Sequence, residues 1–418
     1  MSKRRVVITG LGTVNPLAWD VETYWDRLLE GHSGVRPIAR FDASKFDSRI
    51  GGEVQPDWPG LPESHVDKRE IKRLDRFAQF AVAAAIQAVD DAGIDFSKTD
   101  RARCGCLIGS GIGGLQELET QHERMLEKGP GRISPFTVPK LMVNAASANV
   151  AIQWGLRGHN TAVATACASA TNSIGDAARL IRLGLTDVMI CGGSEAALTR
   201  IGLGSFCALK ALSTRNDEPA RASRPFDRDR DGFVLAEGAG LAVLEELEHA
   251  RRRGARILAE LVGYGSNCDA SHITAPDPEG AGATGAMQMA LADAGVAPEQ
   301  IDYVNAHGTS TQLNDISETR ALKKVFGQYA YHGLVISSTK SALGHLLGAS
   351  GGVELIATVK TILTGWIHPT QNLENAAAEC DLDYCPLKKR QKDVRHAMSN
   401  SFGFGGHNAV LVVKRYEP

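Results

Sequence analysis

Short apolar runs alternate with longer amphipathic stretches along most of the chain. The apolar runs predict buried strands at residues 6–9, 104–108, 161–165, 187–191, 241–244, 258–262, 301–305, 335–338 and 410–413. An alanine-rich stretch at residues 77–92 predicts a helix that ends at Gly93. Because the runs are apolar on both faces and helical patterns lie between them, we expect an α/β fold in which helices cover the sheets.

One segment of the chain recurs in its second half. Residues 88–94 (AVDDAGI) resemble residues 290–296 (ALADAGV), and each copy ends a predicted helix that is followed by a charged link and a buried strand. The copies lie about half the chain apart, which predicts a duplicated α/β unit. A chance match between two helix–glycine–strand segments is the alternative.

The length of 418 residues predicts two or three structural units. The charged stretch at residues 245–253 resembles a helix that ends at Gly254, and it offers the clearest division of the chain. We therefore place an N-terminal half at residues 1–254 and a C-terminal half at residues 255–418.

Composition excludes several classes of protein. The chain carries 46 basic and 48 acidic residues, a net charge of −2 that offers no global field for nucleic acid or a membrane surface. Its eight cysteines include no CxxC pair, which disfavours zinc ligation and predicts buried thiols in a reducing cytosol. The opening residues, MSKRRVVITG, hold an apolar run too short for a signal peptide. We expect a cytoplasmic protein that binds neither nucleic acid nor membranes.

Cys167 is the sharpest candidate for chemistry. The predicted strand at residues 161–165 breaks into a predicted helix at residues 168–183, so Cys167 stands at a helix N-terminus. Free amide hydrogens and the positive end of the helix dipole favour a thiolate there. A small buried core cysteine is the equally open alternative.

Two histidines follow predicted strands in the second half. His307 and His345 both lie just beyond the carboxyl ends of strands, where α/β folds place their sites. Each alone is more often structural, but with Cys167 they form a Cys–His–His set. Two neutral imidazoles can hold a developing enolate oxygen by hydrogen bonds. Lys340 and Glu354 are expected to form a buried ion pair beneath them, with an ordinary structural salt bridge as the alternative.

A glycine-rich segment at residues 399–408 (SNSFGFGGHN) precedes the last strand. Its backbone freedom suits a loop that approaches a ligand closely, and its amides could form an oxyanion hole. A plain glycine-rich hairpin is the alternative.

Long blocks around these residues resemble one family. Cys167, together with NAHGTST (305–311), STKSALGH (338–345) and SNSFGFGG (399–406), resembles the β-ketoacyl-[acyl-carrier-protein] synthases of the thiolase superfamily. The likeness runs from VVITGLG near the start to the final strand, and type II synthases are the most similar. It implies a thiolase-like, five-layered α/β/α/β/α sandwich built from two similar halves, and a homodimer.

The resemblance implies a decarboxylative Claisen condensation. Cys167 would receive the acyl chain of acyl carrier protein as a thioester, and the amides of Cys167 and Phe404 would hold the oxyanion. His307 and His345 would bind the malonyl thioester carbonyl and stabilise the enolate left by carbon dioxide. Catalysis would need no cofactor, because phosphopantetheine arrives on the carrier protein.

Further roles follow from the same resemblance. Thr309 and Thr311 would line the pantetheine channel, Ile112 would shape the acyl pocket, and Phe402 and Phe404 would form a gating loop.

The resemblance also implies support beneath the site. Lys340 would assist the histidines, and a structural monovalent or divalent cation could lie at Asn305, Glu354, Ser399 and Asn400.

The implied partner, acyl carrier protein, is acidic and needs a basic surface. Lys68, Arg69, Lys72 and Arg73 recur at helical i, i+4 spacing, and Lys210 matches a docking position of the family. A solvated helix face is the alternative for the first four.

Two positions depart from the family pattern. Gln312 replaces a common proline, which is expected to loosen its turn, and Asn172 stands where several relatives carry histidine. Fatty-acid elongation is the leading function. A polyketide ketosynthase and a non-condensing partner subunit resembling a chain-length factor are the alternatives. The sequence leaves the preferred acyl length and saturation open.

Overall fold

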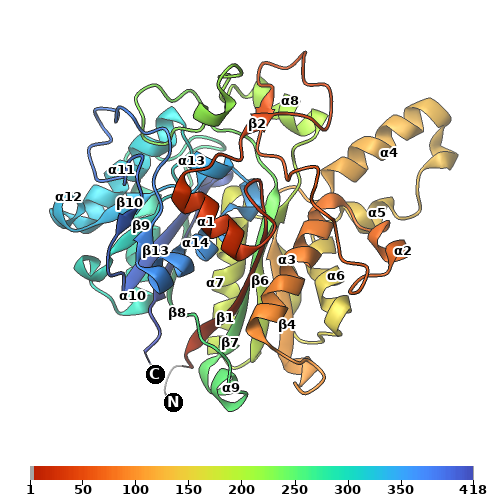
Figure 1. Cartoon of the computed structure of the whole chain (residues 1–418), viewed down its shortest axis with the longest axis horizontal. Coiled ribbons are helices and arrows are strands. Elements are labelled where there is room, and N and C mark those ends of the chain that lie inside the picture. Colours follow the sequence, from red (N-terminus) through yellow and green to blue (C-terminus); the bar gives the residue numbers. More distant parts are fainter. Residues whose placement is uncertain (1–3, 418) are drawn as a thin grey trace.

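A mixed sheet of ten strands runs through the molecule (Figure 1). The computed structural model describes residues 4–417, so residues 1–3 of the opening segment and residue 418 lie outside the described residues. Across the sheet the strands are β10 (Val335–Ser337), β9 (Tyr303–Asn305), β13 (His396–Gly403), β14 (His407–Lys414), β8 (Ala259–Cys268), β1 (Val6–Val14), β7 (Gly238–Glu246), β6 (Val188–Glu195), β4 (Cys104–Gly109) and β5 (Asn160–Val163). Two small ribbons lie apart from it: β2 (Arg36–Pro37) with β3 (Ile50–Gly51), and β11 (Trp366–Ile367) with β12 (Arg390–Gln391).

The strand order repeats. The first half contributes β5-β4-β6-β7-β1, and the second contributes β10-β9-β13-β14-β8, which is the same order when the strands of each half are taken in sequence. The halves meet where β1 pairs with β8 in antiparallel fashion. The expectation of two similar halves is therefore confirmed by topology.

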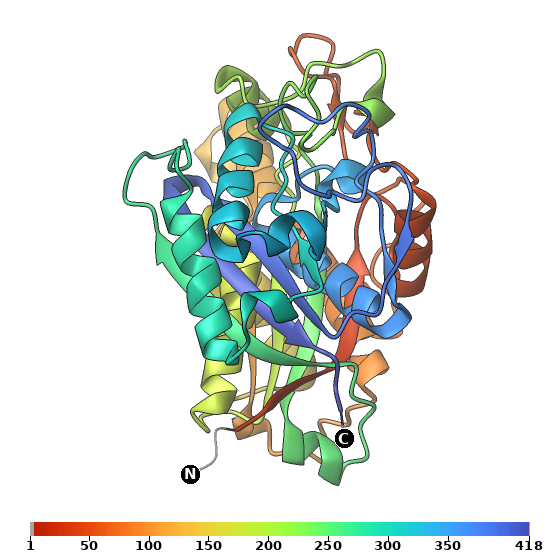
Figure 2. The ribbon, with the colours of Figure 1, turned by 90° about the vertical axis from the view of Figure 1, so that its left-hand side faces the viewer.

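Helices form three layers around the two halves of the sheet (Figures 1 and 2). α3 (Arg76–Ala92) and α6 (Ala145–Trp154) cover the outer face of the first half, and α10 (Ala281–Ala294) and α11 (Gln312–Phe326) cover that of the second. α7 (Ser169–Arg182) and α14 (Ser350–Thr364) lie between the halves, and α14 is buried along most of its length. The predicted α/β/α/β/α sandwich is confirmed.

The other helices connect or flank these layers. They are α1 (Val21–Glu30), α2 (Lys68–Ile71), α4 (Leu115–Lys128), α5 (Thr137–Leu141), α8 (Arg200–Ala208), α9 (Leu247–Arg252), α12 (Tyr329–His332) and α13 (Lys340–Leu343). Within residues 4–417, no helix combines the length and the apolar character needed to cross a bilayer.

The repeated sequence segment has a packing explanation. A Cβ on Gly10 of β1 would lie 2.0 Å from the carbonyl oxygen of Ala88 in α3, and a Cβ on Gly263 of β8 would lie 2.3 Å from that of Ala290 in α10. Each outer helix therefore rests directly on a glycine-bearing strand, and only small residues fit at the contact. The same alanine–glycine contact in both halves accounts for the likeness of residues 88–94 and 290–296.

Two expectations about elements were wrong. Glu245 and Glu246 are the last two residues of β7, and the helix begins only at Leu247. Glu246 is the N-cap of this short helix α9, since its side chain accepts a hydrogen bond from the amide of His249. Residues 399–403, expected in a loop, belong to β13, whose buried Ser399, Asn400 and Ser401 give no apolar signal. The proposed division after residue 254 falls in the link between α9 and β8 and stays a prediction.

Candidate active site

Cys167 lies in a short turn between β5 and α7. The turn spans Ala166–Ala168, and Ala166 adopts a left-handed φ of 49°, a conformation that a non-glycine residue holds only under strain. The glycine-rich strand end reaches this turn, because a Cβ on Gly403 would lie 3.0 Å from the Cys167 nitrogen. At that approach the amide of Phe404 donates a hydrogen bond to the Cys167 sulfur. Two backbone amides, those of Cys167 and Phe404, thus border the sulfur.

Burial decides the ionisation of this thiol. It raises the pKa of Cys167 from its ordinary value of 9.0 to about 11, although the charge of Lys340 and the Phe404 amide act in the opposite direction. A rise of that size corresponds to roughly 3 kcal/mol, whereas a helix end contributes only about 0.3–1 kcal/mol. In the free protein burial therefore outweighs the helix N-terminus, and Cys167 is held as the thiol rather than the expected thiolate.

The two histidines are held in one tautomer. The amide of Leu347 donates to Nδ1 of His345 at 3.2 Å, and the ammonium of Lys340 lies 3.3 Å from Nδ1 of His307. Because these donors have no lone pair to offer, both Nδ1 atoms accept, and each neutral ring carries its proton on Nε2. Burial and the nearby charge of Lys340 hold the pKa of both histidines well below 6.5. Both rings are therefore neutral N–H donors at physiological pH.

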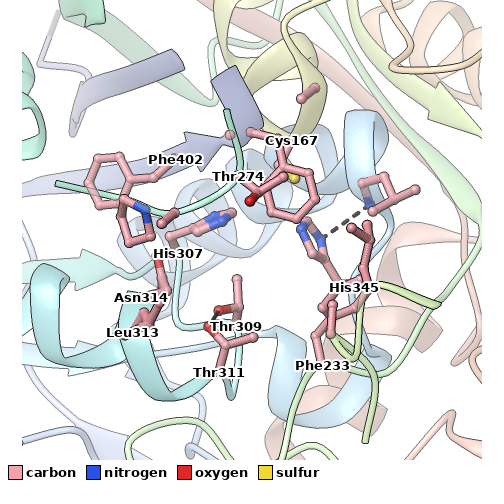
Figure 3. A pocket seen from close by; sticks show the side chains of 18 of the residues that line it. Cys167, Phe233, Thr274, His307, Thr309, Thr311, Leu313, Asn314, His345 and Phe402 are labelled. Atoms are coloured by element: carbon pink, nitrogen blue, oxygen red, sulfur yellow. Dashed lines mark hydrogen bonds between the residues drawn. The ribbon is translucent and has the colours of Figure 1, made fainter. Parts of the chain in front are cut away.

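The thiol and the two rings converge. Sγ of Cys167 and one ring nitrogen of each of His307 and His345 lie within 4.8 Å of one another, and Figure 3 shows both rings beside the sulfur. This composition could suggest a metal site, but a metal-binding histidine needs an unprotonated ligating nitrogen and an acceptor at the other one. The second nitrogens here meet donors. The arrangement suits hydrogen bonding to a carbonyl or enolate oxygen instead.

Lys340 is the support beneath His307. Its buried ammonium donates to the carbonyl oxygen of His307 at 2.7 Å and forms an ion pair with Glu354, which is also buried. The expected pair therefore exists. Because Lys340 also contacts Nδ1 and the carbonyl oxygen of His307, the pair is more than an ordinary structural salt bridge.

Cys167, His307 and His345 open into a cavity of about 500 Å³. Thr309 and Thr311, whose hydroxyl groups lie 2.9 Å apart, line it on one side (Figure 3). The other sequence-predicted residues on its wall are Ile112, Cys167, Lys210, His307, His345, Phe402 and Phe404. The structure thus brings the expected pocket and catalytic residues together.

The basic segment lies away from that cavity and is less helical than expected. α2 ends at Ile71, so Lys72 and Arg73 lie beyond it, where the chain tightens into i→i+3 turns before α3. The i, i+4 spacing therefore does not describe one helix face. Lys68 pairs with Glu63 at 2.9 Å, and Arg73 pairs with Glu70 at 2.6 Å.

Sequence reasoning missed Glu318. This fully buried carboxylate of α11 accepts the amides of His307 and Gly308 at 2.9 and 2.8 Å and the side-chain amide of Asn400 at 3.1 Å. Burial raises its pKa to about 7. The carboxylate fixes the turn that carries His307. An acidic residue in a helix usually marks a solvated face, so the sequence held no signal for it.

The four residues expected at a cation share one property. Each has a buried side-chain oxygen without a hydrogen-bond partner: Asn305 Oδ1, Glu354 Oε2, Ser399 Oγ and Asn400 Oδ1. Asn305 and Ser399 face each other across the β9–β13 pair. Unpaired buried oxygens cost about 1–3 kcal/mol each, so a cation ligated by them would relieve a real penalty.

The two departures from the family pattern are accommodated locally. The Gln312 side chain donates to the carbonyl of Arg230 at 2.6 Å, and the Arg230 guanidinium donates back to the carbonyl of Gln312. The turn is therefore held, contrary to the expectation that it loosens. Asn172 donates to Tyr264 and Ser266 and accepts from Thr165.

Comparison with known families covers almost the whole chain. The family described as beta-ketoacyl synthase, N-terminal domain, matches residues 3–250, and its C-terminal domain matches residues 258–374. The chain belongs to the β-ketoacyl synthase family. The resemblance noted in the sequence is confirmed at this level.

Curated relatives agree with this family. A 3-oxoacyl-[acyl-carrier-protein] synthase 2 of Synechocystis is 52% identical over 417 residues, covering 100% of this chain and 99% of the relative. The protein of the same name from Coxiella burnetii is 50% identical and covers 99% of each chain.

Solved β-ketoacyl synthases share the fold. A type II polyketide ketosynthase in complex with its acyl carrier protein and bound to the hexaketide has a TM-score of 0.92 at 35% identity, and covers 100% of both chains. A beta-ketoacyl synthase of Burkholderia phymatum has a TM-score of 0.91 at 35% identity, covering 99% of this chain and 100% of that one.

The raised pKa of Cys167 predicts how the thiol reacts. Thiolate is the minority form below about pH 11, so the rate of alkylation by iodoacetamide should rise about tenfold per pH unit between about pH 7 and pH 10. Lys340→Met should slow the reaction at every pH, because the variant loses the charge that favours the thiolate. Site-resolved peptide mass spectrometry measures the rate, with the exposed Cys268 as internal reference. A plateau near pH 8 at Cys167 would contradict the burial argument.

Proposed function

We propose that this β-ketoacyl synthase is a 3-oxoacyl-[acyl-carrier-protein] synthase that elongates fatty acids by decarboxylative Claisen condensation. The observation that carries the proposal is the convergence of two neutral imidazole N–H donors on a buried thiol. The names of relatives about half identical over the full chain support it.

The first half-reaction is acyl transfer. Cys167 sulfur attacks the thioester carbonyl of acyl carrier protein, the new C–S bond forms, and the carrier thiol leaves with the proton that the resting Cys167 carried. The amides of Cys167 and Phe404 donate to the oxygen on which negative charge builds. Their fixed positions require no reorganisation during the step.

The second half-reaction is decarboxylation and condensation. The malonyl thioester carbonyl accepts from Nε2–H of His307 and of His345, so the electron pair left by carbon dioxide is held as an enolate. The enolate carbon then attacks the Cys167 thioester. A C–C bond forms, the C–S bond breaks, and the departing thiolate sulfur takes a proton from water.

Fatty-acid elongation is favoured over the alternatives. The similar polyketide ketosynthase is 35% identical, against 52% for the synthase named for fatty-acid chemistry. A non-condensing partner subunit would have no use for the complete set of Cys167, His307 and His345.

Acyl carrier protein is the proposed partner. A similar solved structure holds a ketosynthase with its acyl carrier protein. Lys210, which is exposed and lines the cavity, is paired with Asp47 at 2.7 Å. Exposed pairs of this kind contribute about 0–1 kcal/mol and can be exchanged for the acids of a partner. A cytoplasmic location fits a reaction that consumes soluble carrier protein.

A homodimer fits the sheet edge. β5 is an edge strand without charged residues, and such an edge invites a second strand. α6 packs on β5, and α5 packs on α6. Apolar side chains are exposed in and beside α5: Ile133, Phe136, Val138 and Met142. A second copy related by a twofold axis would cover both the edge and this patch.

The two half-reactions separate the roles of the catalytic residues. Cys167→Ala should abolish acyl transfer, measured as the mass increment on the intact protein after mixing with acyl carrier proteins of several lengths. His307→Ala and His345→Ala should keep acyl transfer but lower malonyl decarboxylation about 10²–10³-fold. Equal loss of both half-reactions in a histidine variant would contradict this division, and undiminished condensation by Cys167→Ala would remove Cys167 from the mechanism.

Charge reversal tests the docking surface. Exchange of Lys68, Arg69, Lys72 and Arg73 for Glu should weaken binding of acyl carrier protein, and the loss should shrink as salt is raised. The matched control reverses Lys388 and Lys389, two exposed lysines of a different segment. Titration calorimetry at two ionic strengths measures the affinity. An unchanged affinity would place the docking surface elsewhere.

A cation at Asn305, Glu354, Ser399 and Asn400 should stabilise the fold by mass action. The midpoint of thermal unfolding should rise in K⁺, Na⁺ or Mg²⁺ relative to tetramethylammonium at equal ionic strength, and Ser399→Ala should reduce the rise. Thr361→Val is the matched control, because Thr361 in α14 also has a buried unpaired hydroxyl but is not one of the four. Identical midpoints in every ion would refute the site.

A further inference from the structure

Glu195, the last residue of β6, is a buried carboxylate that the proposed mechanism does not use. Its Oε1 accepts the Ser110 hydroxyl at 2.8 Å and the Ile112 amide at 3.3 Å. Its Oε2 accepts the amides of Gly111 at 2.6 Å and Gly348 at 3.1 Å. The Glu195 carboxylate therefore accepts hydrogen bonds from two segments that are far apart in the sequence, residues 110–112 and Gly348.

The first segment carries a wall of the cavity. Residues 110–112 follow β4, and Ile112 lines the cavity near Cys167. Ser110 is tied further, because its hydroxyl accepts the amide of Gly113 at 3.0 Å. The position of Ile112 thus depends on Glu195, whose carboxylate accepts hydrogen bonds from the amides of Ile112 and Gly111 and from the hydroxyl of Ser110.

The second segment orients His345. Gly348 follows Leu347, whose amide donates to Nδ1 of His345. Leu347 is a non-glycine residue at a φ of 48°, a strained conformation that the surroundings must hold. The two segments also touch directly, because a Cβ on Gly348 would lie 2.4 Å from the nitrogen of Gly111.

We infer that Glu195 is a positioning residue that couples the Ile112 wall of the acyl cavity to the turn holding His345, and thereby sets which acyl chain lengths Cys167 accepts. The inference rests on the proposed condensing function. An acyl chain that displaces Ile112 must stretch the hydrogen bonds that the buried Glu195 carboxylate accepts from residues 110–112. Chains that fit the existing wall meet no such resistance.

Glu195→Gln tests the inference, because the side-chain amide can accept at only one of its two positions and places an NH₂ group against donors. The ratio of Cys167 acylation rates between the preferred and a disfavoured chain length should fall roughly tenfold. Malonyl decarboxylation should fall as well, since the turn at His345 loosens. In an Ile112→Ala background, which removes the wall, Glu195→Gln should leave the acylation ratio unchanged.

Two further variants make the result decisive. Ser110→Ala removes one donor to Glu195 without altering the carboxylate, and it should shift the ratio in the same direction by less, even where Glu195→Gln fails to fold. Asp302→Asn is the matched control: Asp302 accepts the amides of Arg395 and His396, ahead of β9 and away from the cavity, and its loss should leave the ratio unchanged.

Other outcomes would overturn the inference. If Glu195→Gln and Ser110→Ala slow all chain lengths equally, Glu195 is only structural. If the unmodified protein takes no acyl group from any carrier protein, the proposed function itself fails, which is a different result from a flat profile in the variants.

Discussion

The active site depends on one buried ion pair. Lys340 is held in the interior by Glu354, and from there its ammonium contacts both the carbonyl and Nδ1 of His307. A lone buried ammonium would cost several kcal/mol, so the carboxylate of α14 is the condition for its presence. Removing either partner would leave an uncompensated charge beneath the histidine. We interpret the ion pair as the group that holds His307 in one tautomer, rather than as a source of net stability.

Burial then shifts the ionisation of Cys167, His307 and His345 toward the neutral form. The same desolvation that raises the pKa of Cys167 to about 11 holds the pKa of His307 and His345 low. A neutral thiol with two neutral N–H donors is a poor metal site and a poor thiolate–imidazolium pair. It suits a reaction whose negative charge appears only on substrate oxygens, which the fixed donors can meet without reorganisation.

The sequence predicted what apolar periodicity and glycine placement encode. The strands were located, and the repeat at residues 88–94 and 290–296 led to the duplicated fold, because small residues at a close helix–strand contact leave a visible pattern. The polar strand β13 is not predicted from the sequence, because its buried Ser399, Asn400 and Ser401 have the composition of a loop. Glu195 and Glu318 are not predicted for a related reason. No spacing in the sequence distinguishes a buried carboxylate that accepts hydrogen bonds from backbone amides from an acidic residue on the surface.

The duplicated fold explains how one architecture yields an asymmetric site. Ala166–Ala168 ahead of α7 and Leu347–Ala349 ahead of α14 are equivalent turns, with left-handed φ values of 49° and 48° at Ala166 and Leu347. In the first turn the next residue is Cys167, beside the amide of Phe404. In the second it is Gly348, whose amide is taken by Glu195. Both halves thus build a strained turn that presents amides to negative charge. Because a permanent carboxylate fills the second, only the first is left to receive the charge of a substrate.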